Sequence, residues 1–205
     1  MSRKSNDSTY KKPDHFTVDA KKAGFPARSV FKLEEIDQRT RILKPGMHVL
    51  DLGSSPGSWS RYVSLKIGKN GRLLSIDLKP LETALGPNST FVQGDAFDIS
   101  SGIHESFAPY DVVLSDMAPS TTGNRLSDQT RSFDLCMRAL DVAKETLKPG
   151  GAFVAKIFMG GDLPLARAEV RKIFEQERLI RPEGTRSVSY EIFVVGLSKR
   201  GEPKS

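Results

Sequence analysis

The sequence contains little cysteine, little histidine and no long hydrophobic run, and each shortage excludes a class of protein. Its 205 residues include one cysteine, Cys136, so no disulfide can form within the chain. The three histidines, His15, His48 and His104, lack the spacing of a structural zinc site, and we expect no metal. No apolar run approaches the roughly 20 residues that span a bilayer, and the N-terminus is polar where a signal peptide would be apolar. These absences predict a cytoplasmic protein that does not enter a membrane.

Basic residues outnumber acidic ones, 31 to 25, which gives a formal net charge of +6. Most of the excess lies in the first 32 residues, which hold eight basic and three acidic side chains. Charge confined to one segment favours a local contact with a polyanion such as RNA over a generally basic surface. A solvated tail without a partner explains the same charge equally well.

The chain is long enough for one globular domain, and its two ends differ from its middle. Residues 1–13 have no hydrophobic periodicity and several basic side chains, so they are predicted to form a flexible arm. Residues 14–199 are predicted to form a single domain, and residues 200–205 a short tail. Early in the domain, Pro26 and apolar residues at helical intervals predict a helix that carries Lys32.

From residue 48 onward, short apolar runs alternate with segments of helix length. The expected strands are residues 48–52, 72–77, 90–93, 110–116 and 151–158. Helices are expected from about residue 57, briefly after residue 93, over 128–148 and over 163–176. This alternation is typical of parallel strands joined by crossover helices.

The last two apolar runs are residues 178–180 and 190–198, and the connection between them is too short for a crossover helix. The last strand is therefore predicted to be antiparallel. The fold class that follows is α/β, with a single doubly wound, mostly parallel sheet and an antiparallel last strand.

Charged residues stand where the predicted parallel strands end. They are Asp51, Asp77, Asp95, Asp116 and Lys156. In an open parallel sheet these ends meet at one edge, where ligands bind. Each residue alone has an ordinary explanation, since polar residues often lead out of strands. Together they favour a functional site at this edge.

A loop with two glycines follows the first predicted strand, within DLGSSPGSW at residues 51–59. Gly53 and Gly57 allow backbone conformations and close approaches that other residues forbid, which indicates a cofactor loop. The dinucleotide pattern G-x-G-x-x-G would need glycines at Ser55 and Ser58, which argues against a nicotinamide dehydrogenase.

Other residues at the same edge narrow the cofactor and the substrate. Asp77 is placed to accept hydrogen bonds from a ribose diol, and Asp95 from an adenine amino group. Trp59 either packs its helix on the sheet or contacts the cofactor. The loop SDMAPS at 115–120 resembles the acidic-x-x-Pro loops of S-adenosylmethionine methyltransferases, without the aromatic residue typical of amino-group methylases. A hydroxyl substrate needs a basic group instead, and Lys156 supplies one.

Four segments together resemble the FtsJ-like 2′-O-ribose RNA methyltransferases: DLGSSPGSW, SDMAPSTTG, GAFVAKIF and RSVSYEIFVV. The similarity runs from about Asp14 to Lys199 and is strongest with the short bacterial branch that methylates a uridine in large-subunit ribosomal RNA. It implies a Rossmann-like methyltransferase fold, S-adenosyl-L-methionine as cofactor, and large-subunit ribosomal RNA as partner, either free or within the assembled subunit. We also expect a monomer.

The resemblance also implies which residues act. The positions that match the family's catalytic tetrad are Lys32, Asp116, Lys156 and Glu191. Those that match its cofactor contacts are Gly57, Trp59, Asp77, Asp95 and Asp116, to which the loop analysis adds Gly53. The chain departs from the family in having serine at 54, 55, 58 and 120, and small residues replace small ones in the cofactor loop. Glu191 also has support from the residues alone, because an antiparallel last strand begins at the edge where the others end.

Three alternatives remain open. A transfer RNA ribose methyltransferase would use the same tetrad, and a noncatalytic ribosome-assembly factor would keep the fold to bind RNA. A small-molecule O-methyltransferase is disfavoured by the basic arm. Lys156 has two possible roles, as a neutral general base or as a charged group that orients the hydroxyl.

Overall fold

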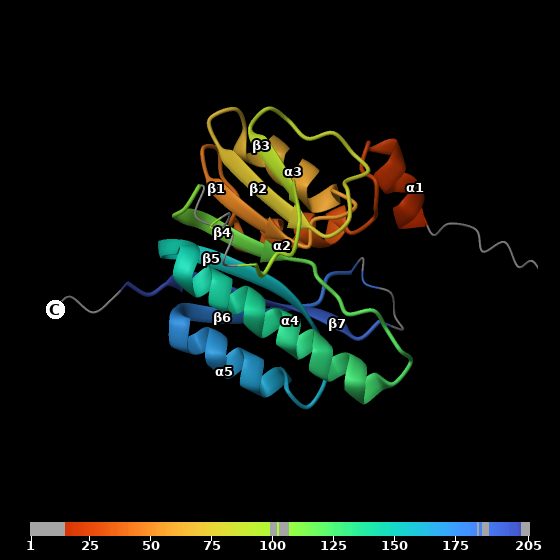
Figure 1. Cartoon of the computed structure of the whole chain (residues 1–205), viewed down its shortest axis with the longest axis vertical. Coiled ribbons are helices and arrows are strands. Elements are labelled where there is room, and N and C mark those ends of the chain that lie inside the picture. Colours follow the sequence, from red (N-terminus) through yellow and green to blue (C-terminus); the bar gives the residue numbers. More distant parts are fainter. Residues whose placement is uncertain (1–14, 99–101, 103–106, 184, 186–188, 202–205) are drawn as a thin grey trace, which may run out of the picture.

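The computed structural model describes residues 15–98, 102, 107–183, 185 and 189–201, and these form one seven-stranded sheet with helices on both faces (Figure 1). The strands are β1 (His48–Leu52), β2 (Arg72–Asp77), β3 (Ser89–Gln93), β4 (Tyr110–Ser115), β5 (Leu147–Phe158), β6 (Phe174–Ile180) and β7 (Glu191–Lys199). Their order is β3-β2-β1-β4-β5-β7-β6, and the first five are parallel. Strand β7 runs antiparallel to both of its neighbours. The predicted fold class is confirmed.

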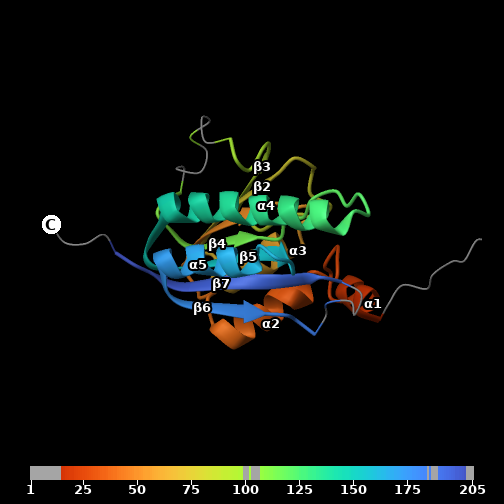
Figure 2. The ribbon, with the colours of Figure 1, turned by 90° about the horizontal axis from the view of Figure 1, so that it is seen from below.

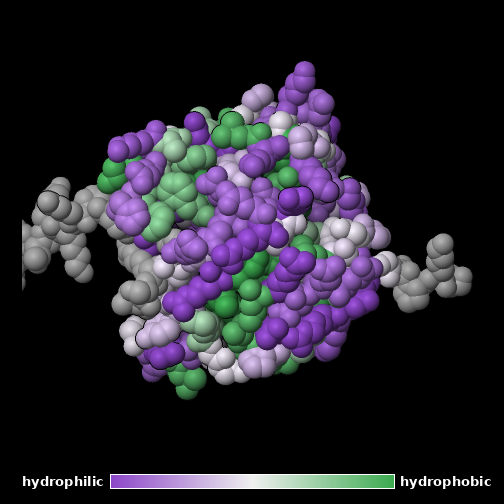
Figure 3. Space-filling model, turned by 180° about the vertical axis from the view of Figure 1, so that it is seen from behind, coloured by the Kyte–Doolittle hydropathy of each residue, from purple (hydrophilic) through white to green (hydrophobic). Residues whose placement is uncertain are grey.

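Helices cover both faces of this sheet. They are α1 (His15–Lys22), α2 (Val30–Thr40), α3 (Ser58–Ile67), α4 (Arg125–Thr146) and α5 (Leu163–Ile173). Figure 2 shows α4 above the sheet and α2 below it. On the face of the molecule turned away in Figure 1, a band of hydrophobic residues crosses a largely hydrophilic surface (Figure 3). No helix in the described ranges is long and apolar enough to cross a membrane.

Alternating side chains of the strands divide the core into two layers. In β1, Leu50 and Leu52 belong to the layer under α4 and α5, whereas Val49 belongs to the layer that contains Trp59 of α3. This is the two-residue period of a strand whose faces are both covered. Each central strand therefore reads as an apolar run, and for that reason the sequence pattern locates these strands.

Helix α4 begins three residues before its predicted start, because Asn124 caps it. The Asn124 side chain accepts a hydrogen bond from the backbone N–H of Ser127 at 3.2 Å. The helix carries the apolar stripe of an amphipathic helix, with Cys136, Leu140 and Ala143 all buried against the sheet.

The boundary between α5 and the next strand lies earlier than predicted. The helix ends at Ile173 rather than at residue 176, and β6 begins at Phe174 rather than at residue 178. Phe174 is fully buried and stacks on Phe153 with ring centroids 6.1 Å apart. Its ring also fills the space over Gly196, where a Cβ would lie 2.5 Å from it. Burial of this ring draws the chain into the sheet before the helical pattern ends.

Two further segments differ from expectation. Helix α1 was not predicted, because it has eight residues and buries only Ala20. Residues 94–98 form turns where a short helix was expected, and Asp95 accepts a hydrogen bond from the backbone N–H of Phe97. The rest of that expected helix, the arm at 1–13 and most of the tail lie outside the described residues.

Candidate active site

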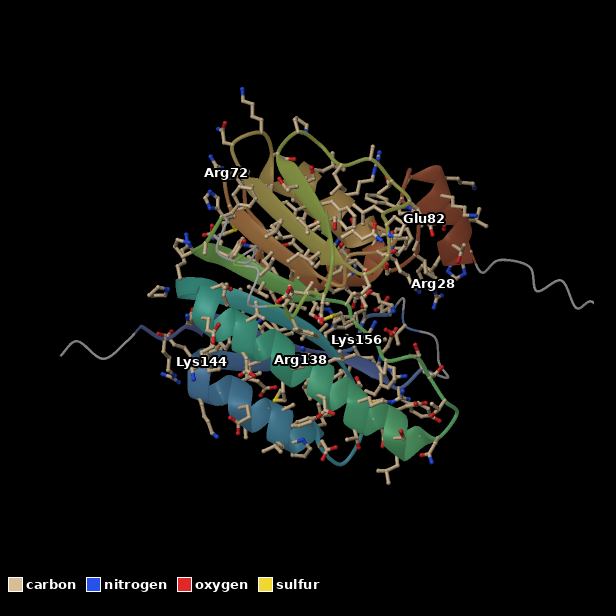
Figure 4. All side chains as sticks on the ribbon, in the orientation of Figure 1. Arg28, Arg72, Glu82, Arg138, Lys144 and Lys156 are labelled. Atoms are coloured by element: carbon tan, nitrogen blue, oxygen red, sulfur yellow. The ribbon has the colours of Figure 1, made fainter. Side chains whose placement is uncertain are left out.

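The carboxyl ends of β1 to β4 surround a cavity of about 660 Å³, a volume in the range of small-molecule sites. Four of the six residues predicted to bind a cofactor line it: Gly53, Asp77, Asp95 and Asp116. Figure 4 shows Lys156 and Glu82 on this side of the molecule, whereas Arg72 and Lys144 lie at the opposite end of the sheet. This cavity lies at the edge of the sheet where the sequence predicted a site.

Both loop glycines adopt backbone conformations that would be strained in any other residue. Gly53 has φ +77°, and a Cβ on it would lie 2.2 Å from Cγ of Met117. Gly57 has φ +110°, and a Cβ there would lie 2.7 Å from Cγ2 of Thr83. Gly53 lines the cavity, whereas Gly57 forms the N-cap of α3 and does not line it. The glycines thus shape the loop by letting two neighbouring segments approach closely.

The Asp77 carboxylate is fixed by the backbone of two loops. Its Oδ2 accepts a hydrogen bond from the N–H of Ser55, and its Oδ1 accepts one from the N–H of Lys79, both at 2.8 Å. A carboxylate offers about four lone-pair sites. Asp77, which lines the cavity, therefore keeps acceptor capacity beyond these two hydrogen bonds.

Asp51 does not lie at the edge with the other carboxylates but is buried beneath the loop. Its side chain is on the α3 face of β1, where Oδ2 accepts a hydrogen bond from the Ser60 hydroxyl at 2.6 Å. Within the described structure its Oδ1 is buried without a hydrogen-bond partner. Burial raises the pKa of Asp51 to about 7, the Ser60 hydrogen bond opposes this rise, and the negative charges of Asp116 and Asp77 add to it.

Trp59 packs in the core rather than on the cavity. It is 2% exposed, its Nε1 donates to the carbonyl of Ser29 at 2.8 Å, and its ring lies 5.6 Å from that of Phe193. The residue joins α3 to the start of α2. The structure thus places Trp59 and Gly57 outside the cavity lining, and their contact with a cofactor stays a prediction.

Lys156 and Asp116 form one half of the predicted tetrad. The Nζ atom of Lys156 donates to the Asp116 carbonyl at 2.5 Å and to its Oδ1 at 3.0 Å. The lysine side chain is 8% exposed and the aspartate side chain 18%. Both hydrogen bonds point the amino group at the residue that lines the cavity.

Lys32 and Glu191 form the other half, as an ion pair between α2 and the first residue of β7. Their side chains are 10% and 13% exposed. In the β5–β7 register, Glu191 lies opposite Phe158 and Lys156 lies opposite Phe193. Glu191 and Lys156 are therefore diagonal neighbours on the α2 face of the sheet, with Cα atoms about 7 Å apart. The fold brings all four residues to one edge.

Sequence reasoning missed one wall of the cavity. Arg138 of α4 places its guanidinium carbon 3.9 Å from the ring centroid of Phe97, and both residues line the cavity with Leu135. Leu135 and Arg138 are three residues apart and so share a helix face. That spacing could have shown from the sequence that the two residues share a helix face. Only the position of α4 over the sheet shows that this face borders the cavity.

Comparisons with known proteins agree with this geometry. Residues 25–199 match the sequence model of the FtsJ-like methyltransferases. A protein of Sorangium cellulosum named "Ribosomal RNA large subunit methyltransferase E" is 57% identical over 196 residues, covering 96% of this chain and 92% of that protein. A protein of the same name from Bdellovibrio bacteriovorus is 49% identical, over 94% of this chain and all of that protein.

Among solved structures, a candidate ribosomal RNA methyltransferase from Plasmodium falciparum has a TM-score of 0.75 and 25% sequence identity. The similarity covers 87% of this chain and all of that one. The family match spans the whole described site, from the start of α2 to the end of β7. The chain therefore belongs to the FtsJ-like methyltransferase family.

Proposed function

We propose that this protein transfers a methyl group from S-adenosyl-L-methionine to the 2′-hydroxyl of a ribose, that of a uridine, in large-subunit ribosomal RNA. The observation that carries the proposal is the position of the Lys156 amino group, held by Asp116 at the cavity and beside the Lys32–Glu191 pair. The names of the relatives support large-subunit ribosomal RNA as the substrate.

The cavity suits an adenosine-based cofactor. Asp77 would accept hydrogen bonds from its ribose, Asp95 from its adenine amino group, and Gly53 leaves room for its approach. Asp116 lies where it can face a positively charged sulfur. When bound, S-adenosylmethionine supplies the methyl from its sulfonium sulfur, which keeps the electron pair of the broken carbon–sulfur bond.

Lys156 acts as the general base in this proposal. A neutral amine has two N–H donors and one lone pair, and Asp116 provides acceptors for two donors. The lone pair is then left to accept the proton of the 2′-hydroxyl as its oxygen forms the new bond to carbon. Asp116 thus orients the base, and much of the rate comes from holding oxygen and methyl in line.

The Lys32–Glu191 pair positions the ribose. Each partner has hydrogen-bonding capacity beyond the ion pair, since an ammonium has three donors and a carboxylate about four acceptor sites. The pair lies beside Lys156 on the same face of the sheet. It would hold the sugar so that its 2′-oxygen faces the amino group.

The RNA would cross the edge of the sheet, with its phosphates bound by the N-terminal arm and the helix that carries Lys32. The protein would act in the cytoplasm as a monomer. Both the arm's role and the monomeric state are predictions.

The test is methyl transfer from labelled S-adenosylmethionine to separate RNA pools. Purified protein is incubated with large-subunit ribosomal RNA, small-subunit ribosomal RNA, transfer RNA and intact large ribosomal subunits, all from cells that lack the enzyme. Label is expected in large-subunit RNA, free or assembled, and in neither of the other pools. Label in transfer RNA alone, or in none of the pools, would overturn the proposed substrate.

A further inference from the structure

Tyr190 is the one phenylalanine, tyrosine or tryptophan side chain in the described ranges that is exposed, at 45%. Its backbone carbonyl accepts a hydrogen bond from the N–H of Met159 at 2.7 Å, which fixes it at the end of β5. A ring that is 45% exposed at the edge of the candidate active site leaves part of its surface free to contact a ligand.

The ring lies immediately beside the tetrad but on the other face of the sheet. Tyr190 precedes Glu191, so their Cα atoms are about 3.8 Å apart. Successive side chains of an extended chain point to opposite faces. Glu191 points towards Lys32 of α2, and Tyr190 accordingly meets α4, where Arg125 contacts it. Tyr190 thus stands next to the ribose position and outside it.

Arg125 lies over this ring. Its guanidinium carbon lies 4.0 Å from the Tyr190 ring centroid, within stacking distance. Guanidinium planes and aromatic rings, tyrosine among them, are surfaces on which proteins stack unpaired RNA bases. A single charged residue over the ring would serve a phosphate as well, but an exposed aromatic partner favours a base.

The N-terminal turns of α4 hold Arg125 in place. The Gln129 side chain donates to the Met159 carbonyl at 2.5 Å, and Ser132 accepts a hydrogen bond from the N–H of Phe158 at 2.9 Å. Both contacts join α4 to the end of β5, the same segment that holds Tyr190. The two halves of the pair are therefore fixed to one support, which lowers the entropy lost when a ligand binds.

We propose that the Arg125–Tyr190 pair is a stacking site for an unpaired nucleobase of the RNA substrate, that of the nucleotide next to the methylated one. This inference rests on the proposed function in one respect, since it takes the ribose of the target nucleotide to lie at Lys156 and Glu191. The site selects substrates in which the neighbouring base is free to leave its helix. Double-stranded RNA without a loop or bulge would bind it poorly.

The test compares Tyr190→Ala, Tyr190→Phe and Arg125→Lys in binding of fluorescently labelled large-subunit ribosomal RNA fragments. Loss of one stacked base weakens binding about 5- to 160-fold, so the Kd of Tyr190→Ala should rise by more than threefold. The Kd of Tyr190→Phe should stay within threefold of wild type. Arg125→Lys, which keeps the charge but loses the plane, should also weaken binding. Leu165→Ala, an exposed apolar residue of α5, is the matched control and should change nothing.

Salt dependence separates stacking from charge. The loss in Tyr190→Ala should be the same factor at about 50 and 200 mM salt, because no phosphate contact is removed. An RNA Kd within threefold of wild type for Tyr190→Ala, or equal losses in the phenylalanine and alanine variants, overturns the stacking site. Binding is measured without turnover, so the two proposals can fail separately. A methyl group found elsewhere than on the ribose refutes the proposed function alone. Ribose methylation together with an unchanged Kd for Tyr190→Ala refutes the stacking site alone.

Discussion

Breaking the Lys32–Glu191 pair should separate its contribution to stability from its contribution to catalysis. The side chains are 10% and 13% exposed, so removing one partner leaves the other charge nearly buried. Removal of one partner from a fully buried pair lowers the free energy of unfolding by about 3 to 5 kcal/mol. Because these two side chains keep some exposure, we expect a loss of about 2 to 4 kcal/mol. For a domain of this size each kcal/mol moves the melting temperature by about 2 to 4 °C. Lys32→Met and Glu191→Gln should each melt about 4 to 16 °C below wild type.

The double variant Lys32→Met/Glu191→Gln removes both charges at once. It should regain most of the lost stability, because neither side chain then carries a buried charge without a partner. It should nevertheless stay inactive, since both groups that position the ribose are changed. Thermal melting followed by circular dichroism gives the stability cycle, and methyl transfer to large-subunit ribosomal RNA gives the activity. Additive losses of stability, or restored activity in the double variant, would refute this account of the pair.

Three further outcomes are expected. Lys156→Ala and Lys156→Arg should each lower methyl transfer at least 100-fold, because neither side chain can accept the proton at useful pH. Calorimetry should find the cofactor affinity of both variants within about threefold of wild type. An active arginine variant would exclude Lys156 as the general base. Asp51 has its pKa raised to about 7, so the folded protein binds the extra proton between about pH 4 and 7 and loses stability as the pH rises through that window. The stability of Asp51→Asn relative to wild type should therefore increase by up to about 3 kcal/mol from pH 5 to pH 8, measured as a rise in its melting temperature relative to that of wild type. A difference that does not vary with pH would contradict the raised pKa of the buried Asp51 carboxyl. Deleting residues 1–12 should weaken RNA binding. It should also lower the slope of the logarithm of the binding constant against the logarithm of salt concentration by up to about 3, since each lost phosphate contact contributes about 0.7. An unchanged slope would leave the arm without a role in binding.

The sequence predicted the sheet well because its central strands are buried on both faces and appear as separate apolar runs. Boundaries that depend on tertiary packing were less accurate. Phe174 belongs by pattern to a helix but by burial to β6, and α1 buries too little for a pattern to show. The oligomeric state and the domain limits stay predictions.

The residues of the candidate site likewise fall into those that the sequence could locate and those whose position depends on tertiary packing. Asp77, Asp95 and Asp116 could be found by chain position, because parallel strands end at one edge of the sheet. Lys32 came only from the family resemblance, since its contact with Glu191 depends on how α2 packs over the sheet. Asp51 was assigned to the edge, although its place within β1 points it at α3 and Ser60. Strand alternation alone contained that information.

The most direct measurement asks which atom of the RNA receives the methyl group. Large-subunit ribosomal RNA methylated with labelled S-adenosylmethionine is hydrolysed in alkali, which cleaves after every nucleotide whose 2′-hydroxyl is free. A methyl group on the 2′-oxygen blocks that cleavage, so the proposal predicts that the label stays in an alkali-resistant dinucleotide. Label released in single nucleotides would place the methyl on a base and contradict the role of Lys156 as the base that deprotonates a ribose hydroxyl.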